Sequence, residues 1–100
     1  MKESAYVYIL TTKRNTVLYT GVTNSLERRM SEHELGTSNG FAAKYHAHKL
    51  VYAQPFDSIR EAIAWEKRLK SGSRAKKVEL IERGNPDWKN LWRKKEIQPR

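Results

Sequence analysis

The chain has 100 residues, of which 38% are hydrophobic, and its 20 Lys/Arg against 11 Asp/Glu give a formal net charge of +9. This length predicts one domain with one modest core, and the lack of cysteine excludes a disulfide framework and a cysteine-based zinc site. No apolar run approaches the roughly 18 residues of a membrane span, and the N-terminal segment does not fit a signal peptide, so we expect a cytoplasmic protein with no membrane partner.

The first third of the chain predicts a β-hairpin followed by a helix. Residues 5–12 and 17–22 are rich in β-branched and aromatic side chains, and a polar stretch separates them. Asn24, with Glu27 three positions later, matches the capping box that begins a helix. We expect this helix to reach about Glu34.

The rest of the chain predicts a third strand and two more helices. Ser58 and Glu61 repeat the capping pattern. The expected elements are a loop at 36–40, a strand over 49–54 that Pro55 ends, a helix over about 58–70, a helix over 74–83, and a short helical turn over 88–92. The order β-β-α-β-α-α predicts a small α+β domain over residues 1–92, with a basic tail at 93–100.

Charged residues interrupt the apolar faces of two predicted helices. The first helix has one stripe made of Leu26, Arg29, Met30 and His33, and the second has one made of Ile59, Ala62, Ile63, Glu66 and Leu69. A carboxylate that faces a core is costly unless it is paired or holds a cation. Arg29 and Glu66 therefore indicate one shared crevice. The structural alternatives are that they pair with each other beneath the sheet, or extend along the stripe edges to water.

The order of these motifs resembles the GIY-YIG nuclease superfamily. Tyr6-Val-Tyr8 precedes Tyr19-Thr-Gly21 by ten residues, and helices carrying Arg29 and Glu66 follow. The resemblance reaches to about Trp92 and is strongest to short stand-alone bacterial members related to the N-terminal nuclease module of the repair enzyme UvrC. It implies a central three-stranded antiparallel sheet flanked by helices. Tyr6 and Thr20 depart from the motif, which has Gly and Ile there, but no reactive side chain is lost.

The resemblance implies a metal-dependent endonuclease. The implied catalytic residues are Tyr8, Tyr19, Arg29, His33 and Glu66, of which Glu66 holds one Mg²⁺ or Mn²⁺ ion, and the implied supporting residues are Gly21, Tyr45 and Asn85. Arg29 would stabilise charge on the phosphate. One tyrosine would orient or deprotonate the water, as a phenolate favoured by Arg29 and the metal, or would pass its proton to His33. Gly21 would let the chain turn from strand to helix beside the substrate.

The basic charge lies mainly in the C-terminal part, where residues 60–100 hold 13 Lys/Arg against 6 Asp/Glu. Such a surface favours nucleic acid, because phosphate neutralisation releases counterions. We expect DNA rather than RNA, in a repair or processing role, with contacts from Lys44, Lys67, Lys70, Arg74, Lys76 and Lys77. The alternatives are a charge that serves only solubility, a non-catalytic and RNA-directed binding module, and a protein adaptor that uses exposed Trp88 and Trp92. For the nuclease, a protein partner is the expected source of specificity.

Overall fold

The computed structural model describes residues 5–35 and 46–92, and the side chains of residues 33–35 are left out of that description. In chain order the elements are β1 (Ala5–Thr11), β2 (Leu18–Thr23), α1 (Leu26–Leu35), β3 (Lys49–Phe56), α3 (Ile59–Ser71) and α4 (Arg74–Gly84). The predicted α+β fold and its β-β-α-β-α-α order are confirmed.

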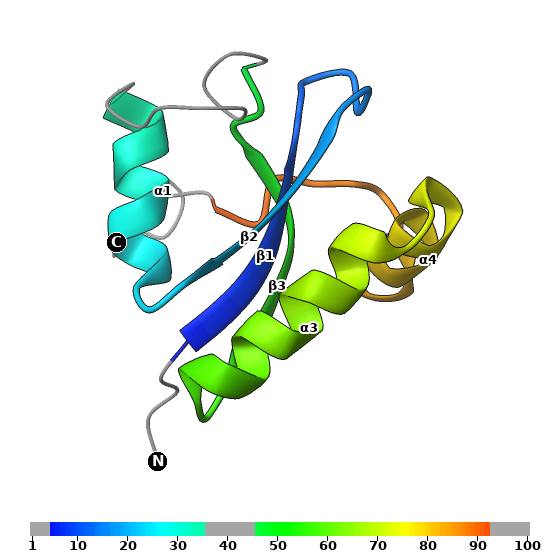
Figure 1. Cartoon of the computed structure of the whole chain (residues 1–100). Coiled ribbons are helices and arrows are strands. Elements are labelled where there is room, and N and C mark those ends of the chain that lie inside the picture. Colours follow the sequence, from blue (N-terminus) through cyan, green and yellow to red (C-terminus); the bar gives the residue numbers. More distant parts are fainter. Residues whose placement is uncertain (1–4, 36–45, 93–100) are drawn as a thin grey trace.

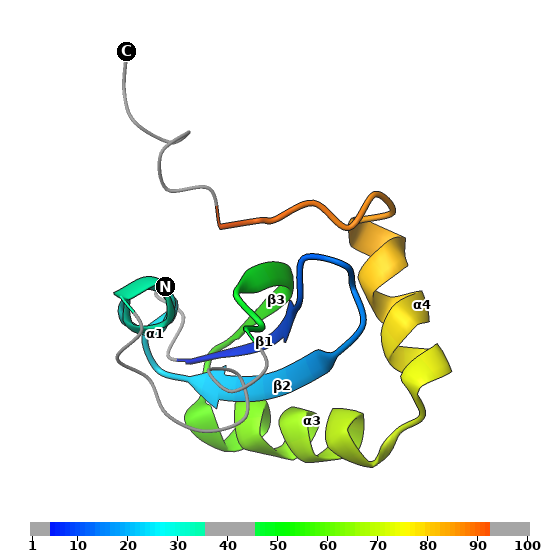
Figure 2. The ribbon, with the colours of Figure 1, turned by 90° about the horizontal axis from the view of Figure 1, so that it is seen from above.

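The three strands form one antiparallel sheet in the order β2-β1-β3 (Figure 2). β1 takes the centre because it is apolar on both faces, and all but one of its residues are buried. α1 covers one face of the sheet, whereas α3 and α4 lie on the other (Figure 1). The two helices that carry Arg29 and Glu66 are therefore on opposite faces.

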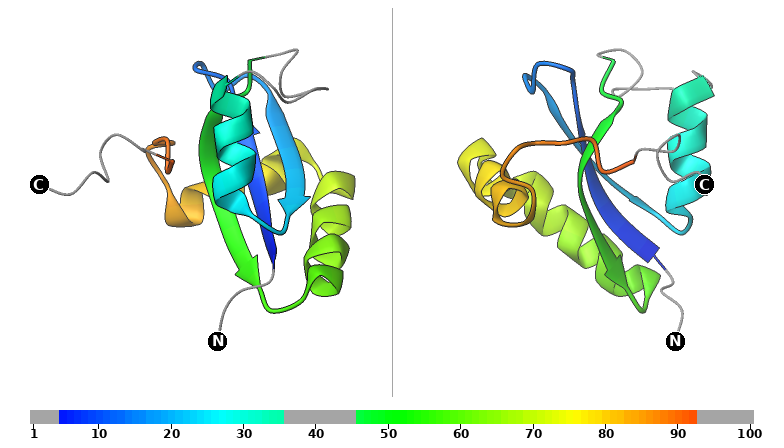
Figure 3. Two further views of the ribbon diagram at one scale, coloured as in Figure 1. Left: turned by 90° about the vertical axis from the view of Figure 1, so that its left-hand side faces the viewer. Right: turned by 180° about the vertical axis from the view of Figure 1, so that it is seen from behind.

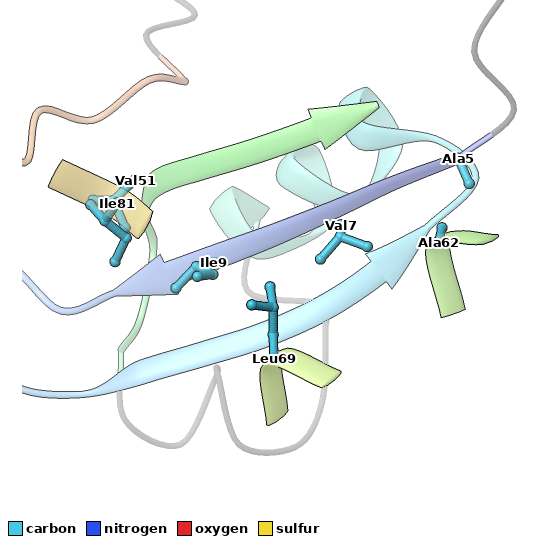
Figure 4. Close-up of a cluster of buried hydrophobic side chains, with 7 residues drawn as sticks. All are labelled: Ala5, Val7, Ile9, Val51, Ala62, Leu69 and Ile81. Carbon is cyan, nitrogen blue, oxygen red and sulfur yellow. The ribbon is translucent and has the colours of Figure 1, made fainter. Parts of the chain in front are cut away.

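Alternating side chains of β1 enter two separate cores. The core between the sheet and the α3–α4 pair contains Ala5, Val7, Ile9, Val51, Ala62, Leu69 and Ile81 (Figure 4). The core under α1 contains Tyr8, Leu10, Met30, Ala47 and Leu50. A tyrosine thus lies among aliphatic residues in the second core. Packing alone does not explain why Tyr8 carries a buried hydroxyl there.

The helix starts follow the predicted capping chemistry, with one shift. The Ser58 hydroxyl accepts a hydrogen bond from the Glu61 amide, as expected for an N-cap. At α1 the prediction was wrong by one residue, because the Ser25 hydroxyl accepts from the Arg28 amide at 3.2 Å. The Asn24 side chain instead accepts from the Arg28 guanidinium at 3.1 Å. The Asn24 side chain is thus bound to the Arg28 guanidinium, and Ser25 is the N-cap.

Three further expectations were wrong. Pro55 does not end β3, which continues to Phe56, because β3 is an edge strand and can accommodate a residue without an amide hydrogen. Residues 88–92 are not helical. Ile59 and Ile63 are exposed, so the inward stripe of α3 is narrower than predicted.

The segment after α4 crosses β3 near the start of that strand (Figure 3, right). The Leu91 amide donates to the Leu50 carbonyl at 2.7 Å, and the Leu50 amide donates to the Asn90 side chain at 3.1 Å. Trp88 packs against the core under α3 and α4, whereas Trp92 packs against the core under α1. Neither indole is fully exposed, which weakens the adaptor hypothesis.

Candidate active site

Tyr8 lies directly opposite Gly21 in the β1–β2 pairing, and its side chain is 1% exposed. A Cβ atom at position 21 would lie 2.5 Å from the Tyr8 hydroxyl oxygen and 2.6 Å from Cζ. Only glycine leaves room for the phenol at this point. The prediction that Gly21 makes the strand-to-helix turn was wrong, because Gly21 lies inside β2 and the turn follows Thr23.

A second tyrosine lies beside the first. Tyr19 shares the sheet face of Tyr8, since it precedes Gly21 by two residues on β2. The two ring centroids are 6.4 Å apart at an interplanar angle of 45°. The two motif tyrosines thus form one cluster on the α1 face of the sheet.

Arg29 points from α1 toward Tyr8. Its Nη1 atom donates to Glu32 at 3.2 Å, and its side chain is 35% exposed. A hydrogen bond and the positive charge of Arg29 both act to lower the pKa of Tyr8. The Arg29 Nε atom is buried and has no hydrogen-bond partner. This guanidinium therefore sits beside the tyrosine with one donor unused.

Glu66 approaches the same tyrosine from α3. Its side chain is only 13% exposed, and Lys70 Nζ lies 2.9 Å from Oε2. Its charge acts to raise the pKa of Tyr8, so the carboxylate lies within electrostatic reach of the phenol. Within residues 5–35 and 46–92, Arg29 forms an ion pair with Glu32 and Glu66 forms one with Lys70, and none joins Arg29 to Glu66. The predicted alternative of a direct Arg29–Glu66 pair is therefore wrong.

The place where these groups meet is the β2 edge of the sheet. β2 is an outer strand, and α3 extends past it when the sheet is viewed from the α1 side (Figure 3, left). α1 begins three residues after β2 ends. We expected a crevice on one sheet face between two helices, and this was wrong, because α1 and α3 lie on opposite faces of the sheet.

Burial raises the pKa of Tyr8 to about 12, with further increases from Tyr19 and Glu66. The Arg29 guanidinium lowers this pKa but does not outweigh the burial. Tyr8 therefore keeps its proton at neutral pH. The expectation that Arg29 and a metal ion together favour a phenolate of Tyr8 or Tyr19 stays a prediction.

The other predicted residues are placed as follows. His33 is in α1, but its side chain lies outside the description, and Lys44 and Tyr45 are not among the described residues. Asn85 contacts the Val51 and Lys89 backbone and supports the chain after α4 rather than the tyrosines. Lys67 and Lys76 are exposed, and Lys77 is half-buried.

Two of the cations predicted to bind nucleic acid have partners within the protein. Arg74 donates to the carbonyls of Asn15 and Thr16 at 2.9 and 3.4 Å, which anchors the β1–β2 turn. Lys70 neutralises Glu66. Glu32, which pairs with Arg29, was not among the predicted site residues, although its spacing three residues after Arg29 on a helix was a usable signal.

The carboxylate of Glu66 fits one divalent cation whose other ligands are water and substrate oxygens. Within the described parts of the chain, no three His, Asp or Glu side chains gather in one place, so a cage of protein ligands is absent there. Glu66 offers a largely buried carboxylate beside a phenol, and its neighbour Lys70 is on a flexible stem. One carboxylate with waters and phosphate oxygens is a common Mg²⁺ environment.

Comparisons with known proteins agree with this geometry. The model of the GIY-YIG catalytic domain matches residues 4–79. A UPF0213 protein of Natronomonas pharaonis is 40% identical over 81 residues, which cover 81% of this chain and 94% of that protein. A UPF0213 protein of Clostridium perfringens is 44% identical over 80 residues, covering 76% and 81%. The solution structure of a Bacillus halodurans UPF0213 protein matches with a TM-score of 0.56 and 34% identity, covering 86% and 90%.

Proposed function

Because the chain belongs to the GIY-YIG family of nuclease domains, we propose that it is a metal-dependent endonuclease that hydrolyses phosphodiester bonds, with DNA as substrate in a repair or processing role. One observation carries this proposal. Arg29 and Glu66 come from helices on opposite faces of the sheet, yet both lie close enough to Tyr8 to shift the pKa of its phenol. A purely structural pair would join the two charges to each other, whereas each has its own partner.

Arg29 supplies the cation for the phosphate. Its guanidinium is planar, always charged, and oriented by Glu32 on the same helix. The unused Nε donor can reach an oxygen of a bound phosphate without breaking a hydrogen bond of the protein. Stabilising the charge that develops on this phosphate is worth about 3–4 kcal/mol, or roughly 10²–10³ in rate.

Glu66 supplies the carboxylate for the cation. Mg²⁺ or Mn²⁺ held there would stabilise charge on the phosphate and on the leaving oxygen. Lys70 must then give up its contact with Glu66, which its exposed side chain permits. Glu66 thus couples cation binding to the release of one lysine beside the site.

Tyr8 and Tyr19 have different roles in activating the water. Tyr8 keeps its proton and orients the attacking water or a phosphate oxygen as a donor. This leaves Tyr19, 6.4 Å away between ring centroids, as the residue that would accept a proton from the water in its phenolate form and become the neutral phenol. Gly21 keeps the space above β2 free for the Tyr8 hydroxyl.

One observation favours a second candidate function, a nucleic-acid-binding module that does not cut. Glu66 is already neutralised by Lys70 at 2.9 Å, an arrangement that is stable without a metal ion. In such a module the same surface would hold phosphate, and Glu66 would serve only to position Lys70. Metal-dependent turnover separates the two functions.

The test is cleavage of labelled duplex, flap, junction and single-stranded DNA, and of matched RNA, by purified protein with Mg²⁺ or Mn²⁺. We expect cleavage of DNA that is lost in Glu66→Gln and reduced at least 10²-fold in Arg29→Ala, with both variants folded and binding DNA. Thermal melts and binding curves accompany each assay. Binding of DNA without cleavage in any metal would overturn the catalytic proposal and support the second candidate.

A further inference from the structure

A cavity of about 260 Å³ lies beside the candidate active site, between β2 and the helices α3 and α4. Its lining residues are Leu18, Tyr19, Thr20, Lys70 and Lys77. Tyr19 belongs to the tyrosine cluster, and Lys70 contacts Glu66. The cavity therefore shares walls with the site but lies on its α3–α4 side.

Thr20 gives this cavity a polar floor. The residue is 4% exposed, and its hydroxyl oxygen is buried without a hydrogen-bond partner. It pairs with Ile9, whose side chain enters the core under α3 and α4. A buried hydroxyl without a partner is costly, and the motif that names the family has isoleucine at this position. The threonine is thus a polar group that packing does not require.

The charges around the cavity are positive. Lys70 and Lys77 both line it, and the lining includes no acidic side chain. Lys77 has no ion pair among the described residues, and its side chain also lines a neighbouring cavity of about 530 Å³. That second cavity contains Trp65, Arg68 and Lys76. A positively charged path therefore leads away from the tyrosines along the α3–α4 junction.

We propose that the cavity at Thr20 and Lys77 binds a second phosphate of the nucleic-acid backbone, next to the phosphate that is cut. This inference rests on the proposed function, because it assumes that the tyrosine cluster holds the scissile phosphate. Thr20 donates its hydroxyl to the phosphate oxygen, and Lys77 supplies the neutralising charge. When a cation takes Glu66, Lys70 is released toward the same phosphate. The strand then continues over Lys76 and Arg68.

The experiment uses inorganic phosphate as the first probe and a five-nucleotide thymidine strand as the second. In ¹⁵N-labelled protein, phosphate should shift the amide signals of Thr20 and Lys77 in one saturable step. Thr20→Val keeps the shape, and because it removes an unpaired buried hydroxyl it should remain folded. We expect about tenfold weaker phosphate and strand binding in Lys77→Gln and a smaller loss in Thr20→Val.

Lys89→Gln is the matched control, since it removes the same charge from an exposed lysine outside the cavity. It should bind both probes within twofold of the unaltered protein. Phosphate shifts scattered over many lysines, or equal affinity in Thr20→Val, Lys77→Gln and Lys89→Gln, would overturn the proposal. If the protein cleaves DNA yet the variants bind as well as the control, only this inference fails. If the variants lose phosphate but no metal supports cleavage, the proposed function fails and the phosphate site stands.

Discussion

The Lys70 ammonium lies 2.9 Å from the Glu66 carboxylate, one helical turn away on α3, so the group assigned to a metal ion already has a cation. A divalent ion must compete with this ammonium for the same oxygens. Lys70→Met should therefore bind Mn²⁺ more tightly, by roughly fivefold to tenfold if the pair contributes about 1 kcal/mol. Titration calorimetry measures this directly.

Lys67→Met provides the control for that titration, because Lys67 is exposed on the same helix and forms no ion pair within the described residues. It should leave Mn²⁺ affinity near that of the unaltered protein. Weaker Mn²⁺ binding in Lys70→Met than in Lys67→Met would contradict the competition and remove Glu66 from its metal role.

Gly21→Ala should disturb Tyr8 rather than the backbone. The added methyl group would lie 2.5 Å from the phenol oxygen, and overpacking of this kind costs about 1–3 kcal/mol. Gly84→Ala is the matched control, since a Cβ atom there meets nothing within 4 Å. Urea denaturation should show the loss at position 21 only. In a Tyr8→Leu background the Gly21→Ala cost should shrink, and an unchanged cost would show that the strain lies elsewhere.

Because of Tyr8, the free energy of unfolding should fall at alkaline pH. Its pKa of about 12 in the folded protein exceeds the usual value near 10, so its neutral form is favoured by folding. This contribution is fully present below about pH 10 and is lost as the pH rises toward 12. The urea midpoint of the unaltered protein should therefore fall relative to that of Tyr8→Phe across that window. A constant difference would mean that Tyr8 does not titrate there.

The neighbours of Tyr8 should move this pKa in opposite directions. Glu66→Gln removes a negative charge and should lower the pKa of Tyr8, whereas Arg29→Met removes a cation and a hydrogen bond and should raise it. Ultraviolet difference titration against the matching Tyr8→Phe background isolates this phenol from the other tyrosines. Shifts of the same sign in both variants would contradict the convergence of Arg29 and Glu66.

Nucleic-acid binding should depend on salt through the α3–α4 junction. Lys76→Glu with Lys77→Glu should reduce the magnitude of the slope of log K against log salt by about 2, because each neutralised phosphate contributes about 0.7–0.9. Arg74→Gln should change this slope much less, because Arg74 already bonds the Asn15 and Thr16 carbonyls. Fluorescence anisotropy at several salt concentrations measures both slopes, and equal slopes in the two variants would contradict this division.

Local signals predicted most of the fold. Hydrophobic alternation and the Ser58 cap gave the strands and α3, because these features depend on neighbours close in the chain. Helical periodicity marked Arg29 and Glu66 as inward-facing but could not tell which sheet face each helix covers. That choice depends on the path of the connections, which is why the meeting point at the β2 edge was not foreseen.

The protonation of Tyr8 also lay beyond the sequence. A tyrosine in an alternating strand is as compatible with a wet face as with a dry one, and only the packing of α1 and β2 around the phenol shows that burial outweighs Arg29. The exchange of Asn24 for Ser25 at the α1 cap has a similar origin, since it depends on where the Arg28 side chain turns.

The chain after α4 also determines how the sheet meets other molecules. A bare outer strand is a template for pairing with strands of other chains and hence for aggregation. On β3 this risk is met by the Leu91 amide and the Asn90 side chain, which bond the two backbone groups of Leu50. Asn85→Ala, which releases this segment from Val51, should therefore promote self-association as well as lower stability. The sheet is therefore asymmetric: the chain after α4 occupies backbone groups at the start of β3, whereas the opposite border, at β2, is where the proposed phosphate cavity lies.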